Sequence, residues 1–248
     1  MEFLEIQELV KHFGGIKAVN NCSFNVDKGS ITALIGPNGA GKTTAFNLIS
    51  GLLKPDSGSI HFNGSRIDNL QPHQITRSGI SRTFQITRDL MEMTLLENLI
   101  VQAPTKGFAD LFQSSILDHE MECAMELLDF VGIAHLAGEK AKNLSYGQKK
   151  LMEFAATLMT EPELIMLDEP AAGINPRLLE DIEERIRVVN QRGITFLIVE
   201  HNMDVVMNLC DPVIVMAYGQ VIAQGSPELI QNDKQVLEAY LGEYNGTA

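Results

Sequence analysis

The pattern of hydrophobic and polar positions divides the chain into three parts. In the first, short apolar runs at residues 3–10 and 22–35 are separated by a turn-rich break at Lys11–Gly15. Ser59–Gly64 then alternates polar and apolar residues, which is typical of an exposed strand that runs into a turn. The first part is therefore predicted to be a small β-rich lobe, and its apolar runs before residue 31 lead into the strand Ile31–Ile35.

The second part, from about residue 89 to residue 158, has few strand-like runs. Its apolar residues recur at helical spacing among acidic ones, as at Met121, Ala124, Met125 and Leu128. This pattern predicts a helical insert. Its methionines are expected to fill the core, with a partner-facing groove as the alternative; they are Met91, Met93, Met121 and Met125.

The third part returns to alternating strands and helices. Continuous apolar runs at 164–167, 194–199 and 213–216 indicate parallel strands that are buried on both faces. An amphipathic helix is predicted over Leu178–Arg192, and a closing helix over 226–241. We expect these strands to share one sheet with the strand Ile31–Ile35, interrupted by the helical insert.

A glycine-rich loop follows the strand Ile31–Ile35 and leads into a helix-like segment. It meets the G-x-x-x-x-G-K-[ST] spacing of a P-loop, in which backbone N–H groups and a helix N-terminus surround phosphate oxygens. Lys42 is expected to bring positive charge to the β- and γ-phosphates, and Thr43 to ligate Mg²⁺. The predicted nucleotide-binding residues of the loop are Gly36, Pro37, Asn38, Gly39, Ala40, Gly41, Lys42, Thr43 and Thr44.

Two carboxylates, Asp168 and Glu169, follow the apolar run 164–167. In open α/β sheets, ligands bind at the carboxyl ends of such strands. Taken alone, the pair is also typical of a strand that ends in an acidic turn. Beside a P-loop, it predicts that Asp168 holds Mg²⁺, directly or through water, and that Glu169 orients or deprotonates the attacking water.

A third motif, Asn143–Gln148, precedes a helix-like segment that is predicted to begin near Lys149. A serine hydroxyl and a glycine N–H at a helix start can donate to phosphate, which makes Ser145 and Gly147 candidates. By itself, this pattern is more typical of an ordinary helix cap.

Composition narrows the classes of function. The 248 residues include 32 acidic and 19 basic ones, and the net charge of −13 argues against a nucleic-acid binder and against direct docking on anionic lipid. No apolar run approaches the roughly 20 residues of a transmembrane helix, and the N-terminus has no signal-peptide character. Three widely spaced cysteines, Cys22, Cys123 and Cys210, predict buried or free thiols in a reducing compartment, with the cytoplasm as the default.

Taken together, the motifs resemble the nucleotide-binding subunit of ABC transporters over essentially the whole chain. The L-S-x-G-Q segment Leu144–Gln148 is the specific part, since most P-loop proteins lack it. The resemblance implies an ATPase that uses ATP and Mg²⁺. It also implies an α/β fold, with a P-loop NTPase (ABC ATPase) core, a small antiparallel β lobe and a helical insert at about 89–158.

The resemblance assigns roles to residues that would otherwise be read as ordinary surface or structural ones. Phe13 is similar to the aromatic residue that stacks on adenine, and Gln85 to the glutamine that senses Mg²⁺ and the γ-phosphate. His201 resembles the switch histidine that contacts the γ-phosphate. Ser145, Gly147 and Gln148 would close over ATP held by a second ATP-binding subunit, either the same or a related chain.

Two positions depart from the usual family pattern. Tyr146 stands where glycine is most common in the signature, and Asn175 stands where many members have aspartate. Asn175, together with stretches such as Arg82–Gln85, resembles the branch that serves uptake of branched-chain or neutral amino acids. Relatives in urea uptake and lipopolysaccharide export share part of this pattern and remain alternatives.

The resemblance implies transmembrane permease subunits as partners and, indirectly, a substrate-binding protein. The chain would then lie in the cytoplasm, peripheral on the inner face of the plasma membrane. An ABC-type ATPase acting on nucleic acid or ribosomes is disfavoured because the chain is acidic and has neither a long coiled-coil insert nor a second ATPase domain. A kinase or GTPase-like switch is disfavoured because Leu144–Gln148 would have no role in it.

Overall fold

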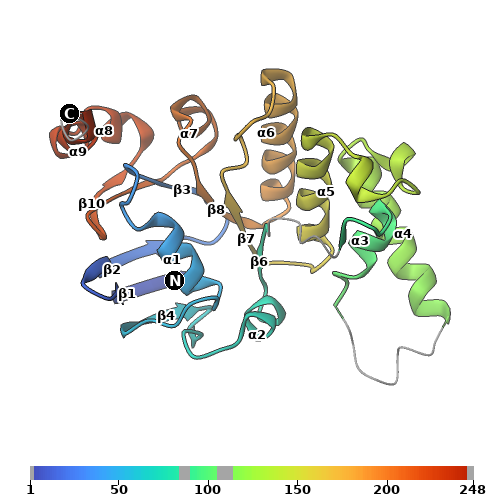
Figure 1. Ribbon diagram of the computed structural model, residues 1–248, viewed down its shortest axis with the longest axis horizontal. Coiled ribbons are helices and arrows are strands. Elements are labelled where there is room, and N and C mark those ends of the chain that lie inside the picture. The colour runs from blue at the N-terminus through green and yellow to red at the C-terminus, as the bar shows by residue number, and fades with distance from the viewer. Residues whose placement is uncertain (1–2, 84–89, 105–113, 245–248) are drawn as a thin grey trace.

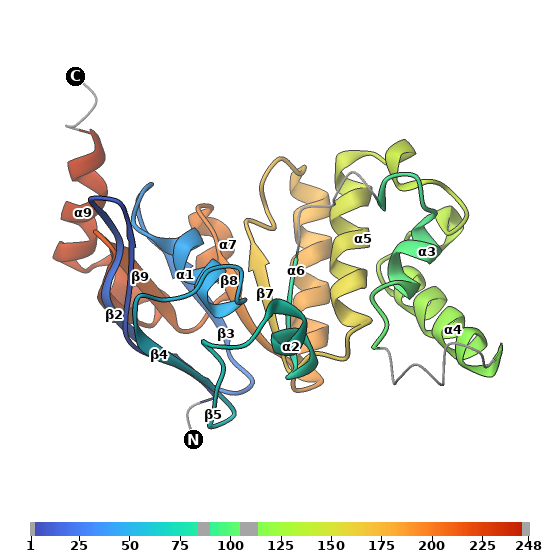
Figure 2. The same ribbon diagram turned by 60° about the horizontal axis from the view of Figure 1, so that its bottom comes forward.

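The structure, a computed structural model, describes residues 3–83, 90–104 and 114–244. Two β-sheets form its centre, and the helices α3, α4 and α5 lie at the opposite end of the molecule from the strands β1 and β2 (Figures 1 and 2). No helix in these three ranges combines the length and the apolar character that a membrane span requires.

The smaller sheet is antiparallel, with the strand order β2-β1-β4-β5. Its strands are β1 (Leu4–Phe13), β2 (Ile16–Val26), β4 (Ser57–Phe62) and β5 (Ser65–Arg66). The predicted turn over Lys11–Gly15 is too long, because Phe13 already pairs with Ile16 and only two glycines make the hairpin turn. Lys11, His12 and Phe13 therefore belong to β1.

The larger sheet has the strand order β10-β9-β3-β8-β7-β6. Its strands are β3 (Ile31–Ile35), β6 (Ile80–Arg82), β7 (Leu164–Asp168), β8 (Thr195–Val199), β9 (Val213–Ala217) and β10 (Gln220–Gly225). All neighbours are parallel except β10, which is antiparallel to β9 at one edge. The prediction that the P-loop strand and the later strands share one sheet is confirmed.

The described helices begin with α1 (Lys42–Ile49) and α2 (Pro72–Arg77). Every described element between β6 and β7 is helical: α3 (Leu95–Ile100), α4 (Ser114–Phe130), the short 3-10 helices η3 (Ala134–Leu136) and η4 (Ala141–Asn143), and α5 (Tyr146–Leu158). The later helices are α6 (Pro176–Gln191), α7 (Met203–Leu209), α8 (Pro227–Gln231) and α9 (Lys234–Tyr244).

Three details differ from the sequence-based expectations. The helix expected to begin near Lys149 begins at Tyr146, because the preceding Ser145 forms a capping box. The single closing helix expected over 226–241 is two helices, since the Asp233 carboxylate accepts the N–H groups of Gln235 and Val236 and so starts a second one. Met121 and Met125 are exposed, so the prediction that they fill the core is wrong.

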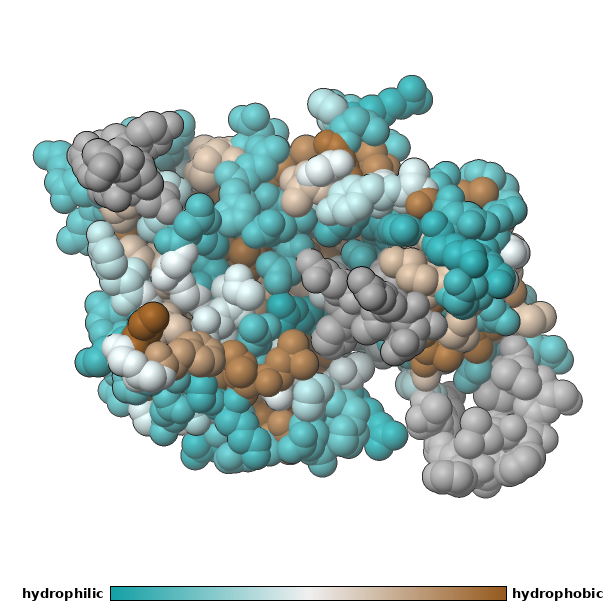
Figure 3. All heavy atoms as spheres, in the orientation of Figure 1, coloured by the Kyte–Doolittle hydropathy of each residue, from teal (hydrophilic) through white to brown (hydrophobic). Residues whose placement is uncertain are grey.

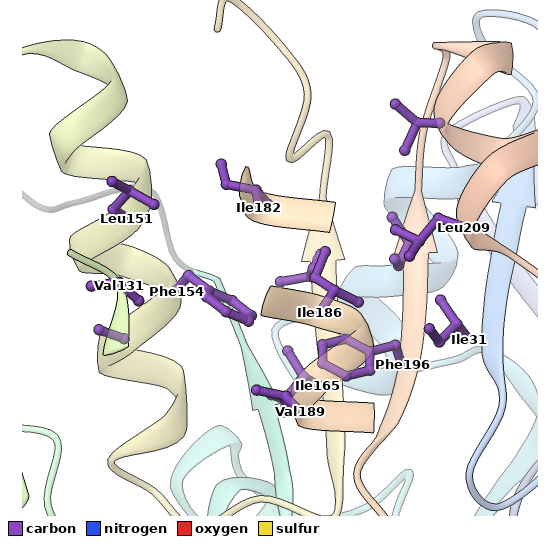
Figure 4. Close-up of a cluster of buried hydrophobic side chains, with 14 of the residues drawn as sticks. Ile31, Val131, Leu151, Phe154, Ile165, Ile182, Ile186, Val189, Phe196 and Leu209 are labelled. Carbon is purple, nitrogen blue, oxygen red and sulfur yellow. The ribbon is translucent and has the colours of Figure 1, made fainter. Parts of the chain in front are cut away.

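The strands of the larger sheet send alternate residues to two separate cores. In β8, Phe196 and Ile198 face the core under the helices, whereas Leu197 and Val199 face the core toward α1 and the antiparallel sheet. In the first core, Ile186 of α6 lies among side chains from α5 and the sheet (Figure 4). The sheet thus separates a helical layer from the layer that carries the glycine-rich loop.

The cysteines are free thiols, as predicted, and Cys22 and Cys210 are buried. Burial raises the pKa of each of these two thiols to about 12. Both therefore stay protonated at neutral pH and behave as small apolar side chains.

We expect Ile186→Ala to lower the free energy of unfolding by about 2–5 kcal/mol, since it removes a buried aliphatic side chain and leaves a cavity. The Ile186 side chain is only 1% exposed. Urea denaturation, followed by circular dichroism, measures the change. Leu229→Ala is the matched control, because Leu229 also lies on a helix but is 68% exposed and should change stability by less than about 0.5 kcal/mol. Equal losses in the two variants would contradict the assigned core.

Candidate functional site

The glycine-rich loop packs tightly against neighbouring backbone. Gly36 and Gly41 have φ angles of 146° and 101°, which L-residues with side chains rarely adopt. A Cβ atom at Gly36 would lie 2.0 Å from the Met216 carbonyl oxygen, and one at Gly41 would lie 2.3 Å from the Ala18 carbonyl oxygen. The two glycines are therefore required by the fold, because any side chain there would push the loop out of place.

The turn between β9 and β10 also holds the loop. The Gly219 N–H donates to the Ala40 carbonyl at 3.0 Å, and the Gly219 carbonyl accepts the Asn20 N–H of β2 at 2.9 Å. The loop is thus bonded to a turn that is itself bonded to the antiparallel sheet. Its shape is set by the surrounding structure before any ligand binds.

Lys42 begins α1 and is nearly buried, with 6% of its surface exposed. Its Nζ donates to the carbonyl oxygens of Gly36 at 2.6 Å and Pro37 at 3.0 Å. The loop is therefore wrapped around the ammonium group of its own lysine. A phosphate would exchange these neutral acceptors for a charged one, which makes a stronger hydrogen bond.

The N-terminus of α1 faces the same loop. Gly41 is its N-cap residue and has no side chain to cap the first turn. Thr43 lies in that turn and is exposed. The positive end of the helix dipole and the threonine hydroxyl therefore lie beside Lys42, an arrangement that favours an anion with an attached cation.

Asp168 ends β7, which is separated in the sheet from β3, the strand before the loop, by β8 alone. Its Oδ2 accepts a hydrogen bond from Nη2 of Arg82, the last residue of β6, at 2.9 Å. The same guanidinium donates to Asn47 Oδ1 at 2.7 Å and to Ser50 Oγ at 3.1 Å, both associated with α1. Arg82 thus links the Asp168 carboxylate to the helix that carries Lys42, a contact that was not predicted from the sequence.

Glu169 and His201 come from loops after two adjacent strands, β7 and β8. The Glu169 Oε1 and the His201 Nε2 lie 2.5 Å apart. Glu169 has a φ of 51°, and its N–H donates to the Val199 carbonyl at 2.9 Å. This left-handed turn directs the carboxylate toward the histidine, so the predicted base and the predicted switch residue are in direct contact.

The signature segment is built as a helix start. The Ser145 Oγ accepts the Gln148 N–H at 3.3 Å, and the Gln148 Oε1 accepts the Ser145 N–H at 2.9 Å, which together form a capping box. A Cβ atom at Gly147 would lie 2.4 Å from Leu178 Cδ2 of α6. The Ser145 hydroxyl and the Gln148 side chain thus bond within their own helix start, and Gly147 packs against α6.

Both departures from the usual family pattern have a place in this packing. The Tyr146 ring lies against Gly173, where an added Cβ would be 3.1 Å from the ring. The Asn175 Oδ1 accepts the Leu178 N–H at 3.0 Å and caps α6. The segment that follows Glu169 is therefore in contact with the signature helix.

The structure brings some of the predicted site residues together and leaves others apart. Lys42, Asp168, Glu169 and His201 lie at or just after the carboxyl ends of the neighbouring parallel strands β3, β8 and β7. Helix α5, which Ser145 caps, lies apart from α1 in both views of the chain (Figures 1 and 2). Gln85 lies outside the described residues.

Phe13 lies at the end of β1, in the hairpin, and its ring is exposed. Most of the surface on the face drawn in Figure 3 is hydrophilic, and brown residues gather in a strip over the part that Figure 1 draws as β1, β2 and α1. An exposed aromatic ring at the end of a hairpin has the form that a stacking contact with a base requires.

The donor set fits Mg²⁺. Across the described ranges, no group of three or more histidine, cysteine, aspartate or glutamate residues could by itself hold a metal ion. Mg²⁺ does not need such a cage, because it is usually bound by one or two protein oxygens together with phosphate oxygens and water. The Thr43 hydroxyl and the Asp168 carboxylate are oxygen donors of this kind.

Known proteins share this architecture. The chain matches the ABC transporter family over residues 19–172 and the branched-chain amino acid ATP-binding cassette transporter family over residues 220–244. It is 45% identical to LivG of Archaeoglobus fulgidus, over 98% of this chain and 96% of that protein. It is 40% identical to the high-affinity branched-chain amino acid transport ATP-binding protein LivG of Escherichia coli K12, over 97% of this chain and 98% of that one.

A solved structure agrees with the fold. The ADP conformation of an ATP-binding cassette of an ABC transporter superposes with a TM-score of 0.86 at 40% sequence identity, covering 98% of this chain and 99% of that chain. The predicted fold class is thereby confirmed. Residues 19–172 match the family, and a relative is 45% identical over 98% of the chain. This chain is therefore a member of the ABC transporter family and carries its ATP-binding cassette.

Proposed function

We propose that this chain is the ATP-hydrolysing subunit that powers an ABC importer of branched-chain or neutral amino acids. One observation carries the proposal: Lys42, Asp168, Glu169 and His201 lie at the carboxyl ends of the neighbouring parallel strands β3, β8 and β7. Ligands of open α/β sheets bind at this edge. The family membership and the ADP-bound structural relative support ATP as the ligand.

The loop would bind the phosphates of ATP. Lys42 would turn from the Gly36 and Pro37 carbonyls toward the β- and γ-phosphates, and the N-terminus of α1 would add its dipole. Thr43 and Asp168 would hold Mg²⁺, which neutralises charge on the phosphates when it is bound. The exposed ring of Phe13 would stack on adenine.

Glu169 would act on the attacking water. Its carboxylate is held by His201 in the free chain, and this contact keeps both side chains at the loop edge. When His201 turns to the γ-phosphate, the carboxylate becomes available to orient or deprotonate water. Gln85, whose surroundings lie outside the described residues, is proposed to sense Mg²⁺ and the γ-phosphate.

A second subunit would complete each site. Ser145, Gly147 and Gln148 belong to a helix start that lies apart from α1, so they cannot reach ATP held by Lys42 in the same chain without a large movement (Figures 1 and 2). We propose that they close over ATP bound by a partner cassette, identical or related. ATP would then join the two subunits, and its hydrolysis would release them.

The transported substrate is inferred from the comparisons alone, because it would not touch this subunit. Both LivG relatives and the family matched by residues 220–244 support branched-chain amino acids over the alternatives of urea uptake and lipopolysaccharide export. The partners would be transmembrane permease subunits and, through them, a substrate-binding protein. This arrangement places the chain at the inner face of the plasma membrane.

We also propose that residues 89–158 act as a helical subdomain inserted in the ATPase core. Its helices lie at the end of the molecule far from the antiparallel sheet (Figure 1). Val101, Met121 and Met125 are exposed there, which supports a role as a surface for a partner protein.

Glu169→Gln should lower ATP hydrolysis by about 10²–10⁴-fold, because an amide cannot accept the proton of the attacking water. ATP binding should remain, so the variant should form an ATP-dependent dimer that size-exclusion chromatography with light scattering can detect. Glu180→Gln on the exposed face of α6 is the matched control and should leave hydrolysis unchanged. A variant that hydrolyses ATP at the wild-type rate would contradict the role of Glu169.

Affinity purification of the tagged chain from detergent-solubilised membranes should recover transmembrane permease subunits in stoichiometric amount. Mass spectrometry would identify them, together with any second ATP-binding subunit. Recovery of ribosomal proteins or nucleic acid in place of permeases would overturn the transport assignment. Permeases of a urea or lipopolysaccharide system would retain the motor role and correct the substrate.

A further inference from the structure

Glu200 is a charged residue that is almost completely buried. It follows β8 directly, precedes His201, and is 3% exposed. Its position at the end of an apolar strand gives no sequence signal of the direction in which its side chain points. In the structure, the side chain points into the protein and not toward the surface beside His201, which is half-exposed.

Backbone N–H groups of two different loops surround the Glu200 carboxylate. Oε1 accepts the N–H of Ala171 at 2.7 Å, in the loop after Glu169. Oε2 accepts the N–H of His201 at 2.9 Å and that of Asn202 at 3.1 Å, in its own loop. Burying a carboxylate is costly unless such donors meet it, so these three hydrogen bonds account for its place in the core.

The two loops are those that carry the proposed base and the proposed switch. Ala171 lies two residues after Glu169, and His201 follows Glu200 directly. The Glu169 and His201 side chains join the two loops at the surface, and Glu200 joins them below it. When His201 leaves Glu169 for a phosphate, the bonds to Glu200 remain, together with the bond from the Glu169 N–H to the Val199 carbonyl at the end of β8.

We propose that Glu200 is a positioning residue that holds the loop of Glu169 and the loop of His201 in register during ATP hydrolysis. Each carboxylate oxygen serves one loop, so the bridge depends on having two acceptors on one side chain. A glutamine of the same shape offers a single acceptor, and its NH₂ group would face an N–H of one of the loops. Glu200→Gln therefore loosens the link between the two loops without changing any group that would touch ATP.

Hydrogen exchange of the free chain tests the Glu200 bridge without nucleotide. The Ala171, His201 and Asn202 amides should be protected from hydrogen exchange in the free chain, and Glu200→Gln should speed exchange of at least one loop by about tenfold or more. Mass spectrometry of peptides covering 169–174 and 199–204 resolves the two loops. This measurement does not depend on the proposed function, so unprotected amides in the wild-type chain would overturn the bridge alone.

A role of Glu200 in ATP hydrolysis rests on the proposed function and adds a positioning residue to it. We expect Glu200→Gln to lower kcat for ATP hydrolysis by about ten- to a hundredfold, since small displacements of catalytic groups have effects of this size. The KM for ATP should stay within about twofold of wild type, because the loop and Lys42 are untouched. A kcat within about twofold of wild type would overturn the positioning role.

Asp68→Asn is the matched control for lost stability. Asp68 is also a buried carboxylate, accepts the Ile60 N–H at 3.1 Å and pairs with Arg66 on the antiparallel sheet, away from both loops. Asp68→Asn should lower the melting temperature of the protein and leave kcat for ATP hydrolysis unchanged. An equal loss of kcat in both variants would reduce the Glu200 effect to general destabilisation. If Glu200→Gln does not fold, Glu200→Asp serves instead, because it keeps the charge but is one methylene too short to span both loops.

Discussion

Parallel pairing of β3, β8 and β7 constrains where every charged side chain of the site can lie. Adjacent parallel strands end at the same edge, so the loops after them must leave the sheet side by side. Lys42 follows β3, Asp168 ends β7, Glu169 follows it, and His201 follows β8. The sheet thereby brings distant residues to one edge. Lys42 and His201, for example, are 159 positions apart in the sequence.

Each charged group at this edge has a partner within the chain. Lys42 is held by carbonyl oxygens of its loop, Asp168 by Arg82, and Glu169 by His201. On the proposed function, nucleotide binding would exchange these partners for phosphate, Mg²⁺ and water, since none of the three groups is without a partner beforehand. The carbonyl partners compensate the buried Lys42 ammonium in the free chain, because burying a charge without hydrogen-bond partners is costly.

The sequence predicted the fold class and the residues at the edge because both depend on short, local patterns. Apolar runs marked the strands β7, β8 and β9, and the loop of Gly36–Thr44 has a fixed spacing. The strand β6 was missed because three residues in a polar segment carry no periodicity. Arg82 and Glu200 were missed because their partners lie 86 and 29 positions away, and only the fold determines that they meet. Met121 and Met125 share the helical spacing of Ala124 and Leu128, but the sequence does not say which side of the helix meets the core.

The two faces of the larger sheet pack against two separate cores. Alternate residues of one strand, such as Phe196 and Leu197, serve different cores. Packing changes among the helices α3, α4 and α5 are therefore separated from α1 and the glycine-rich loop by a full layer of backbone hydrogen bonds. Substitutions on the outer surface of these helices can therefore change that surface without repacking the side chains around the glycine-rich loop.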